Sequence, residues 1–382
     1  MRILLVGDYA RDPRLGSAKV FFKLQEEFRA LGHQCDLVLS DDIGDRPHNA
    51  HLRRAWSPAS AFAAVRRAMR ASGPYDVVDA ASAEALWIAA ARRVGGWNGA
   101  AVIARSNGLE HLDYQRMLDD AGEGLLHKPW TRRLLYPAVR LSQVAAAARA
   151  ADRLLLLNEG DRAFAVEHGW KRPDAIDLVP HGISSAFIDN APDPDAPRGN
   201  GLLFCGSWAA VKGVSYLAAA FSDVIASGVP ARLSIVGGGV PADEIRSAFA
   251  EAAQPFLTIR DRVPEADVMA AYRSHDLLVA PSTYEGFGMV VIEAMSQRLP
   301  VIATPVGCAR SFVVDNRTGL VVPPRDTAAL AAAIRRALAD AGLRRRLGDS
   351  GFDVVRQMTW RRTAEATLAV YEAARLARNR HA

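Results

Sequence analysis

The chain has few cysteines and no long apolar segment. Its three cysteines, Cys35, Cys205 and Cys308, lie far apart and form no C-x-x-C pair, so the sequence predicts neither a disulfide framework nor a zinc ribbon. No run of about 18 apolar residues occurs, and the apolar run Ile3–Gly7 is too short for a signal peptide. We therefore expect a cytoplasmic protein, in a reducing compartment, without a transmembrane helix.

Two short motifs that would indicate a cofactor or a metal are incomplete. Gly237–Gly239 consists of consecutive glycines after a predicted strand, which is not the G-x-G-x-x-G spacing of a nicotinamide-binding loop. Asp193–Asp195 reads D-P-D, but it lies among prolines, where a linker turn is a simpler interpretation than a metal site. We therefore expect no cofactor and no metal.

The composition is that of a globular protein with more than one core. A chain of 382 residues with 50% hydrophobic content is too long for a single ordinary core and suits two domains. Charged residues make up 23% and aromatic residues 7%, which argues against global disorder. The net charge of +5, from 47 basic and 42 acidic residues, is compatible with an anionic ligand or surface, and we expect no nucleic-acid partner.

Short apolar runs alternate with helical patterns along the whole chain. Because parallel strands need crossover connections, this alternation predicts an α/β fold with parallel sheets covered by helices on both faces. The predicted strands are Ile3–Val6, Cys35–Leu39, Val77–Val78, Val102–Ala104, Leu202–Cys205, Arg232–Val236, Phe256–Ile259, Leu277–Ala280, Val301–Ala303 and Leu320–Val322. The predicted helices are Ala18–Ala30, Ala59–Ala71, Ala83–Arg93, Tyr216–Ser227, Pro241–Ala252, Thr327–Ala339 and Thr359–Arg378.

A segment rich in Pro, Gly, Asp and Asn divides the alternation into two halves. This segment, residues 189–201, is typical of a linker. It separates a predicted N-terminal Rossmann-like domain, residues 1–188, from a C-terminal one, residues 202–358, and residues 359–382 form a last helix. Two such halves predict an active site in a cleft between the ends of their strands.

The strongest local motif is EGFGMVVIEAM, which begins at Glu285 and follows a predicted strand. Gly286 and Gly288 allow backbone N–H groups to approach a ligand at the start of a helix, where the helix dipole favours a diphosphate. Glu285 and Glu293 could instead be the carboxylate pair of a glycosidase. Eight helical residues span about 12 Å, whereas a retaining hydrolase needs about 5 Å, so we expect the two acids to bind different parts of one ligand.

Two further loops carry weaker signals. In FCGSWAAVKGVSYL, Gly206 and Ser207 follow a strand, and Lys212 stands where a new helix begins and where its ammonium group can reach a phosphate. A solvated lysine at a helix start is the alternative interpretation. Gly16 lies between the first strand and the first helix and could face the cleft, although the adjacent Ser17 could simply cap the helix.

These motifs together resemble the GT-B glycosyltransferases of family GT4. The segment Val279–Gly307 resembles the E-x7-E segment of that family, and LVPHGIS, DNRTGLVVPPRD and the final helix with Trp360 extend the resemblance over nearly the whole chain. The resemblance implies a retaining, metal-independent transfer of a sugar from a nucleotide-diphosphate sugar to an acceptor. It assigns donor binding to the C-terminal domain and the acceptor to the N-terminal one.

The resemblance also implies roles for particular residues. Lys212 is expected to neutralise the leaving diphosphate, Glu285 to hold the donor sugar and Glu293 to hold the ribose. Lys212, Glu285 and Asn107 are the expected catalytic residues. The full set of expected donor-binding residues is Gly16, Gly206, Ser207, Lys212, Glu285, Gly286, Phe287, Gly288, Met289, Val290 and Glu293.

The chain departs from the family pattern at two positions. No arginine lies between Cys205 and Lys212, where the family usually has one, and Asn107 stands where the family often has a histidine. Asn107 can still bind a sugar hydroxyl on the acceptor side, and His111 could face the same cleft or sit within its helix. These departures keep two alternatives open, which are a nucleotide-sugar epimerase of the same fold and a paralogue with weak or no activity.

One basic segment suggests a location for the acceptor. Between Leu126 and Arg153 there is a single acid, Asp152, and Trp130 and several leucines lie among the basic residues, which are Lys128, Arg132, Arg133, Arg140, Arg149 and Arg153. This pattern suits an anionic membrane surface, so a lipid-linked acceptor and a peripheral position at the inner face of the membrane are one hypothesis. The alternative is an ordinary solvated helix with Leu134, Leu141 and Val144 packed inward. Pro137 argues against one continuous helix.

Overall fold

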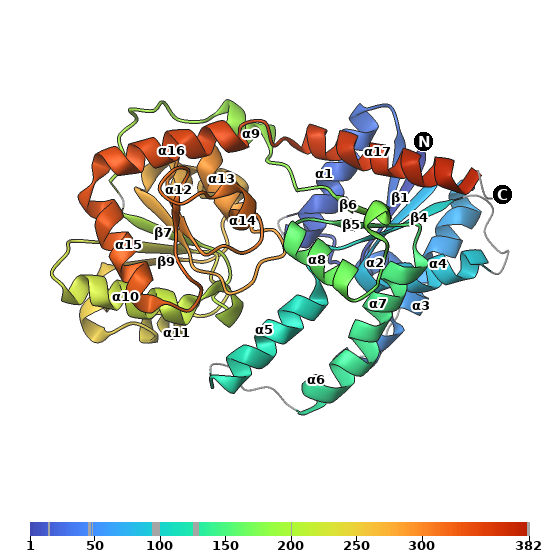
Figure 1. The fold of residues 1–382 in the computed structure, drawn as a ribbon, viewed down its shortest axis with the longest axis horizontal. Coiled ribbons are helices and arrows are strands. Elements are labelled where there is room, and N and C mark those ends of the chain that lie inside the picture. Colours follow the sequence, from blue (N-terminus) through green and yellow to red (C-terminus); the bar gives the residue numbers. More distant parts are fainter. Residues whose placement is uncertain are drawn as a thin grey trace. The chain divides into compact units, whose positions relative to one another are not determined.

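A computed structural model describes residues 1–13, 16–44, 47, 49–93, 100–124, 130–199 and 201–379 of the chain (Figure 1). The chain divides into two compact units. Unit 1 comprises Met1–Tyr114, His127–Gly182 and Trp360–Ala382, and unit 2 comprises Gln115–Leu126 and Ile183–Thr359. The longer segment of unit 2 thus begins at Ile183, a few residues before the predicted linker, and the last helix of the chain belongs to unit 1.

Unit 1 is built on a six-stranded parallel sheet. Its central strands β1, β3 and β4 are almost entirely buried, which is typical of a parallel sheet covered on both faces. The order of the six strands in the sheet is β2-β1-β3-β4-β5-β6. The bounds are β1 Arg2–Val6, β2 Gln34–Val38, β3 Val77–Ala81, β4 Ala101–Arg105, β5 Arg153–Leu156 and β6 Ile176–Leu178.

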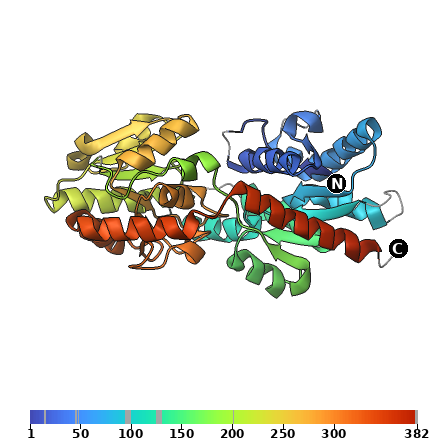
Figure 2. The ribbon, with the colours of Figure 1, turned by 90° about the horizontal axis from the view of Figure 1, so that it is seen from above.

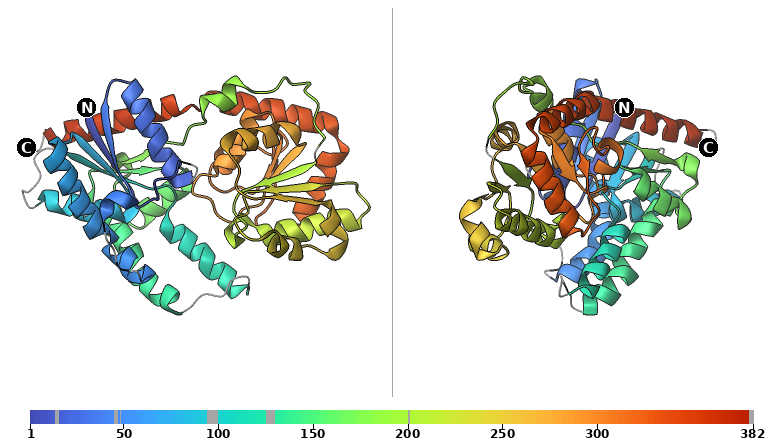
Figure 3. Two further views of the ribbon diagram at one scale, coloured as in Figure 1. Left: turned by 180° about the vertical axis from the view of Figure 1, so that it is seen from behind. Right: turned by 60° about the vertical axis from the view of Figure 1, so that its left-hand side comes forward.

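Helices cover both faces of this sheet. On one face α1 packs against α17, and α17 also contacts β4; on the other face α3, α4 and α7 share a core with the strands (Figures 1 and 3). The buried residues of α1 include Phe21, Leu24 and Phe28, at the spacing of one helix face. The helices of unit 1 are α1 Gly16–Ala30, α2 Ser40–Ile43, α3 Ala50–Ser72, α4 Ala85–Arg93, α6 Trp130–Leu135, α7 Ser142–Ala150, α8 Glu159–Glu167 and α17 Trp360–Asn379. The helix α5, Glu110–Gly122, begins in unit 1, and its residues from Gln115 onward belong to unit 2.

Unit 2 repeats the same architecture. Its six parallel strands lie in the order β12-β11-β10-β7-β8-β9 and are β7 Leu202–Cys205, β8 Leu233–Val236, β9 Leu257–Arg260, β10 Leu277–Ala280, β11 Val301–Ala303 and β12 Leu320–Val321. The helices that surround them (Figure 2) are α9 Ser185–Asp189, α10 Val214–Ala226, α11 Ala242–Ser247, α12 Glu265–Ser274, α13 Met289–Ser296, α14 Ala309–Phe312, α15 Thr327–Ala339 and α16 Ala341–Val355. Two Rossmann-like units confirm the predicted α/β class. The predicted helix Pro241–Ala252 is wrong in length, since α11 ends at Ser247.

The basic segment of unit 1 folds differently from its prediction. Between α6 and α7 the residues Tyr136–Leu141 form a π-helical turn, so the helical backbone continues from Trp130 to Ala150. The wider turn accommodates Pro137, which has no N–H to donate, without ending the helix. Among the residues that the structure describes, no helix is both long enough and apolar enough to cross a membrane.

Candidate functional site

In each unit the strand order reverses at one place, and ligands of open α/β sheets bind at such places, beyond the carboxyl ends of the strands. In unit 2 the reversal lies between β7 and β10, which pair directly, with Leu202 opposite Leu277. The loops that follow these two strands carry Lys212 and Glu285. The topology therefore explains why two residues 73 positions apart meet.

Lys212 is held close to the loop after β10 by its neighbour Gly213. Lys212 ends the short 3-10 helix Ala210–Lys212, and Gly213, with φ of 70°, is the residue before α10. A Cβ atom on Gly213 would lie 1.9 Å from the carbonyl oxygen of Pro281, so only glycine allows this approach. The amide of Thr283 also donates to the carbonyl of Val211, at 2.9 Å, and fixes the two loops together.

The ammonium group of Lys212 is bound by the carboxylate of Glu285. Nζ of Lys212 lies 2.7 Å from Oε1 and 2.8 Å from Oε2 of Glu285, and the hydroxyl of Ser282 donates to Oε1 at 2.8 Å. Both side chains remain partly exposed. The structure thus brings together the two residues predicted to contact the donor phosphate and the donor sugar, and a bound phosphate would compete with Glu285 for Lys212.

The helix N-terminus predicted beside Glu285 is present. Gly288, with φ of 88°, is the residue before α13, and Met289 and Val290 form the first turn of that helix. A hydrogen bond holds the backbone before this helix in place: the amide of Cys308 donates to the carbonyl of Phe287 at 2.6 Å. The helix dipole makes such a terminus suitable for an anion.

Glu293, one and a half turns into α13, is almost completely buried. The hydroxyl of Tyr272, on α12, donates to Oε2 of Glu293 at 3.3 Å and thereby orients the carboxylate. Tyr272 has no exposed surface, and burial raises its pKa well above the ordinary value. Cys205, at the end of β7, lies beside Tyr272, and burial raises the pKa of its thiol to about 11.

The loop after β7 carries no arginine between Cys205 and Lys212, as the sequence indicated. Gly206 has φ of 142° and Ser207 is exposed. The indole of Trp208 packs at 5.9 Å from the ring of Phe204 and at 5.7 Å from that of Phe249. Trp208 therefore contributes to the core of unit 2, and Lys212 is the cation that this loop presents to Glu285.

The candidates in unit 1 lie in different surroundings. Gly16 starts α1, and a Cβ atom on it would have no described atom within 4 Å beyond its chain neighbours and its own helix; Arg14 and Leu15, which precede it, lie outside the described residues. Asn107 donates from Nδ2 to the hydroxyl of Tyr9 at 3.3 Å. His111 packs edge-on against Trp170, with ring centroids 4.6 Å apart, and burial lowers its pKa to about 4. The structure does not bring His111 among the polar residues described next.

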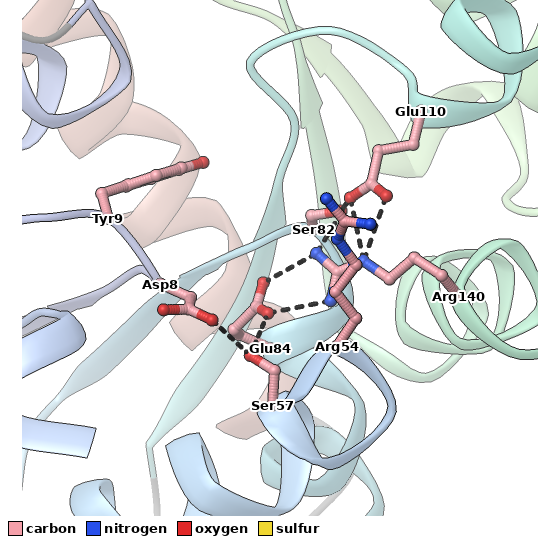
Figure 4. Close-up of a pocket in the computed structure, with 8 residues that line it drawn as sticks. All are labelled: Asp8, Tyr9, Arg54, Ser57, Ser82, Glu84, Glu110 and Arg140. Atoms are coloured by element: carbon pink, nitrogen blue, oxygen red, sulfur yellow. Dashed lines mark hydrogen bonds and ion pairs between the residues drawn. The ribbon is translucent and has the colours of Figure 1, made fainter. Parts of the chain in front are cut away.

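A polar pocket in unit 1 was not predicted from the sequence. Its volume is about 250 Å³, and it is lined by Asp8, Tyr9, Arg54, Ser57, Ser82, Glu84, Glu110 and Arg140 (Figure 4). Asp8 and Tyr9 follow β1, and Ser82 and Glu84 follow β3. The pocket therefore lies where the strand order of unit 1 reverses, between β1 and β3. Polar residues directly after these two neighbouring strands were the feature of the sequence that could have indicated the pocket.

Arg140 is the centre of the hydrogen bonds in this pocket. Its guanidinium donates to both carboxylates, at 2.9–3.2 Å to Glu110 and at 3.0 and 3.4 Å to Glu84. Burial opposes ionisation of Arg140, but the two carboxylates raise its pKa above the ordinary value. Burial likewise raises the pKa of Glu110, but Arg140 outweighs it and holds that pKa below the ordinary value.

The backbone of Ser82 is strained at the edge of the pocket. Ser82 has φ of 49°, a left-handed conformation that costs a non-glycine residue about 1–3 kcal/mol and is common at functional sites. Its hydroxyl donates to Oε1 of Glu110 at 2.6 Å. Within the described ranges, no three His, Cys, Asp or Glu side chains gather closely enough to hold a metal ion.

Comparison with solved structures defines the fold. The chain superimposes over 99% of its length on sucrose-phosphate synthase from Thermosynechococcus elongatus, with a TM-score of 0.79 and 23% identity, and covers 100% of that chain. It also superimposes on WaaG, a glycosyltransferase involved in lipopolysaccharide biosynthesis, with a TM-score of 0.71 and 17% identity. This superposition covers 98% of this chain and 99% of that chain. The protein therefore has the GT-B fold.

Comparison with protein families finds a match in the second half of the chain. Residues 199–340, which include both Lys212 and Glu285, match the family model of the glycosyl transferases group 1.

Two curated relatives are similar over part of their length. A D-inositol 3-phosphate glycosyltransferase of Kineococcus radiotolerans is 30% identical over 267 residues, or 62% of this chain and 61% of that protein. A phosphatidyl-myo-inositol mannosyltransferase of Mycobacterium leprae is 34% identical over 203 residues, or 52% of this chain and 54% of that protein. The chain thus matches less than two thirds of either relative.

Proposed function

We propose that the protein is a glycosyltransferase that moves a sugar from a nucleotide-diphosphate sugar to an acceptor hydroxyl, with retention of anomeric configuration. The observation that carries the proposal is the meeting of Lys212, Glu285 and the N-terminus of α13 at the point in unit 2 where the strand order reverses. A cation and a helix N-terminus suit a diphosphate, and carboxylates suit sugar and ribose hydroxyls.

Catalysis in this proposal is electrostatic. Negative charge builds on the departing diphosphate as the glycosidic bond breaks, and Lys212 and the amides at the start of α13 stabilise that charge. The leaving phosphate takes the proton of the acceptor hydroxyl, so no side chain need act as general base and no metal need take part. Glu285 orients the sugar, and Glu293, held by Tyr272, binds the ribose.

The names of similar proteins support a nucleotide-sugar donor. A protein from Anabaena, with a TM-score of 0.70 and 14% identity, was crystallised with UDP. A thermal-shift panel of nucleotide-diphosphate sugars in the presence of EDTA tests the proposal, because a ligand at 100 times its Kd adds about 2.7 kcal/mol to the stability of the native state. The proposal expects at least one such sugar to raise the melting temperature in EDTA; stabilisation only after Mg²⁺ or Mn²⁺ is added would contradict the metal-independent mechanism.

Glu293→Ala should weaken the binding of the nucleoside diphosphate alone. Loss of a hydrogen bond to a charged group costs about 1.5–3 kcal/mol, which is roughly a 10- to 150-fold rise in Kd. Isothermal calorimetry measures this effect, and Glu244→Ala, which removes an exposed glutamate of α11, is the control that should leave the Kd unchanged. Equal affinities of wild type and Glu293→Ala would remove Glu293 from the ribose site.

We further propose that the acceptor is lipid-linked or lies at a membrane surface. Supporting this, exposed apolar side chains stand beside exposed arginines on two helical segments of unit 1: Trp56 and Leu134 are 60% and 63% exposed, and Arg53 and Arg133 are exposed near them in sequence. Leu134 therefore does not pack inward, although Leu141 and Val144 do.

Only part of the basic segment can contribute to such a surface. Arg140 is engaged in the pocket by Glu84 and Glu110, and Arg153 pairs with Asp177 at 2.6 Å. Lys128 lies outside the described residues. Arg132 and Arg133 remain as the charges on α6 that can meet anionic lipid.

Arg132→Glu/Arg133→Glu should reduce binding to anionic vesicles. Each basic residue near such a surface is worth about 1 kcal/mol, so losing two reduces the partition coefficient by about 30-fold or more. Co-sedimentation with phosphatidylserine-containing vesicles at two salt concentrations measures this, with Arg336→Glu, an exposed arginine of unit 2, as the matched control. Absence of sedimentation of the wild-type protein at low salt would favour a soluble acceptor.

A further inference from the structure

The charge of Lys212 is offset by the carboxylate beside it. Both oxygens of Glu285 accept from Nζ of Lys212, at 2.7 and 2.8 Å. An ammonium group has three hydrogens, so Lys212 can bind this carboxylate and still offer a hydrogen to a phosphate. Neither the loop from Cys205 to Lys212 nor the loop from Pro281 to Glu285 contains another charged residue. A diphosphate that reaches Lys212 therefore meets a neutral ion pair and not a free cation.

The side chain of Glu285 is held in this position by the backbone on both sides. A Cβ atom on Gly307, with φ of 53°, would lie 2.8 Å from Cβ of Glu285, and one on Gly288 would lie 3.5 Å from its Cγ. The hydroxyl of Ser282 donates to Oε1 at 2.8 Å, and the side chain is only 13% exposed. The carboxylate thus has little room to turn away from Lys212 when a ligand binds.

The donor and the product of the proposed reaction differ in two properties that matter to a carboxylate. The donor carries sugar hydroxyls, which can donate hydrogen bonds to it. The nucleoside diphosphate has lost these hydroxyls and has gained a terminal phosphate, whose second ionisation near pH 6 adds roughly one negative charge at pH 7. Glu285 therefore attracts a group of the donor and repels a group of the product.

We propose that Glu285 makes the site discriminate between the sugar nucleotide and the nucleoside diphosphate, by weakening the binding of the latter. While the sugar is present, the carboxylate accepts from its hydroxyls. Once the sugar has left, the same carboxylate offsets the charge of Lys212 and repels the terminal phosphate, which promotes release of the product. The inference rests on the proposed function and adds to it a role for Glu285 after the transfer.

Calorimetry on wild type and Glu285→Gln, in EDTA at about pH 7.5, tests this role. The probes are three pairs, namely UDP and UDP-glucose, ADP and ADP-glucose, and GDP and GDP-mannose. Glutamine keeps the shape of the side chain and removes its charge, so for the pair that binds we expect the Kd of the nucleoside diphosphate to fall about tenfold or more. Tenfold corresponds to 1.4 kcal/mol. The Kd of the sugar nucleotide should fall less than threefold, or rise, because it loses a charged hydrogen-bond acceptor.

The sign of the first change separates this role from a structural one. Damage to the loops would weaken both ligands, whereas the proposal expects the nucleoside diphosphate to bind more tightly. Glu244→Gln, on an exposed glutamate of α11, should leave both Kd values unchanged. Unchanged or weaker binding of the nucleoside diphosphate to Glu285→Gln would overturn the proposal.

The wild-type protein provides a second measurement if Glu285→Gln does not fold. We expect wild type to bind the sugar nucleotide about threefold or more tightly than the nucleoside diphosphate, and equal or tighter binding of the latter would overturn the proposal. Binding of neither member of any pair to wild type would reject the proposed function itself. Binding of a pair with the same preference in wild type and Glu285→Gln would reject this inference alone.

Discussion

Replacing Lys212 with alanine lowers kcat for nucleotide-sugar turnover by about 10²-fold or more, on the scale of losing one group that stabilises transition-state charge. The change also lowers kcat/KM by a similar factor, because the interaction strengthens as the phosphate departs. Steady-state kinetics with the donor varied measures both constants. A rise in KM with kcat unchanged would make Lys212 a binding residue and not a catalytic one.

The structure adds a control to this experiment. Without Lys212, Glu285 keeps its negative charge beside the incoming diphosphate, with Ser282 still donating to it. Part of the loss could then come from repulsion and not from the missing ammonium. The double variant Lys212→Ala/Glu285→Gln removes that charge, so a kcat that stays low in the double variant assigns the loss to Lys212 itself.

Asp79→Asn should destabilise unit 1 by about 3–5 kcal/mol, the cost of leaving a buried charge without its partner. Asp79, on β3, and Arg105, at the end of β4, are fully buried, with Nη2 of Arg105 at 2.6 Å and Nε at 2.9 Å from Oδ2 of Asp79. The hydroxyl of Tyr371, on α17, donates to the same carboxylate and ties that helix to the sheet. Burial opposes ionisation of Arg105, but Asp79 raises the pKa of Arg105 above its ordinary value.

Urea denaturation, with hydrogen exchange of the β3 and β4 amides as the probe for unit 1, measures this loss. Asp174→Asn is the matched control, because Asp174 forms an exposed pair with Arg172 in the same unit and should leave the midpoint nearly unchanged. Equal midpoints for Asp79→Asn and wild type would show that the buried pair contributes little to the stability of unit 1.

Most of the fold follows from local pattern in the sequence. Continuous apolar runs such as Ile3–Val6 and Leu277–Ala280 predict buried parallel strands, and these lie within β1 and at β10. The short strands β5 and β6 were not predicted, since the three apolar residues of β5 and the two of β6 are a weak signal. The π-helical turn at Pro137 was missed because proline usually ends a helix, and the surrounding packing retains this one.

The candidate site was only partly predictable. Lys212 and Glu285 were identified from their loops, but the ion pair between them depends on how closely Gly213 approaches Pro281, which spacing in the sequence does not encode. The unit 1 pocket was missed because two of its members, Ser57 and Arg140, come from helical segments far along the chain. Their meeting with Glu84 is a property of the tertiary fold.

A proton NMR time course of nucleotide-diphosphate sugars with the purified protein, in EDTA, tests glycosyl transfer most directly. It follows the nucleotide, the sugar and the anomeric configuration together. The account predicts release of nucleoside diphosphate, a first-formed product with the donor's anomeric configuration, and loss of both signals in Lys212→Ala. A nucleotide sugar that stays intact, or that changes into its epimer with the sugar still attached, would contradict it and favour an inactive paralogue or an epimerase.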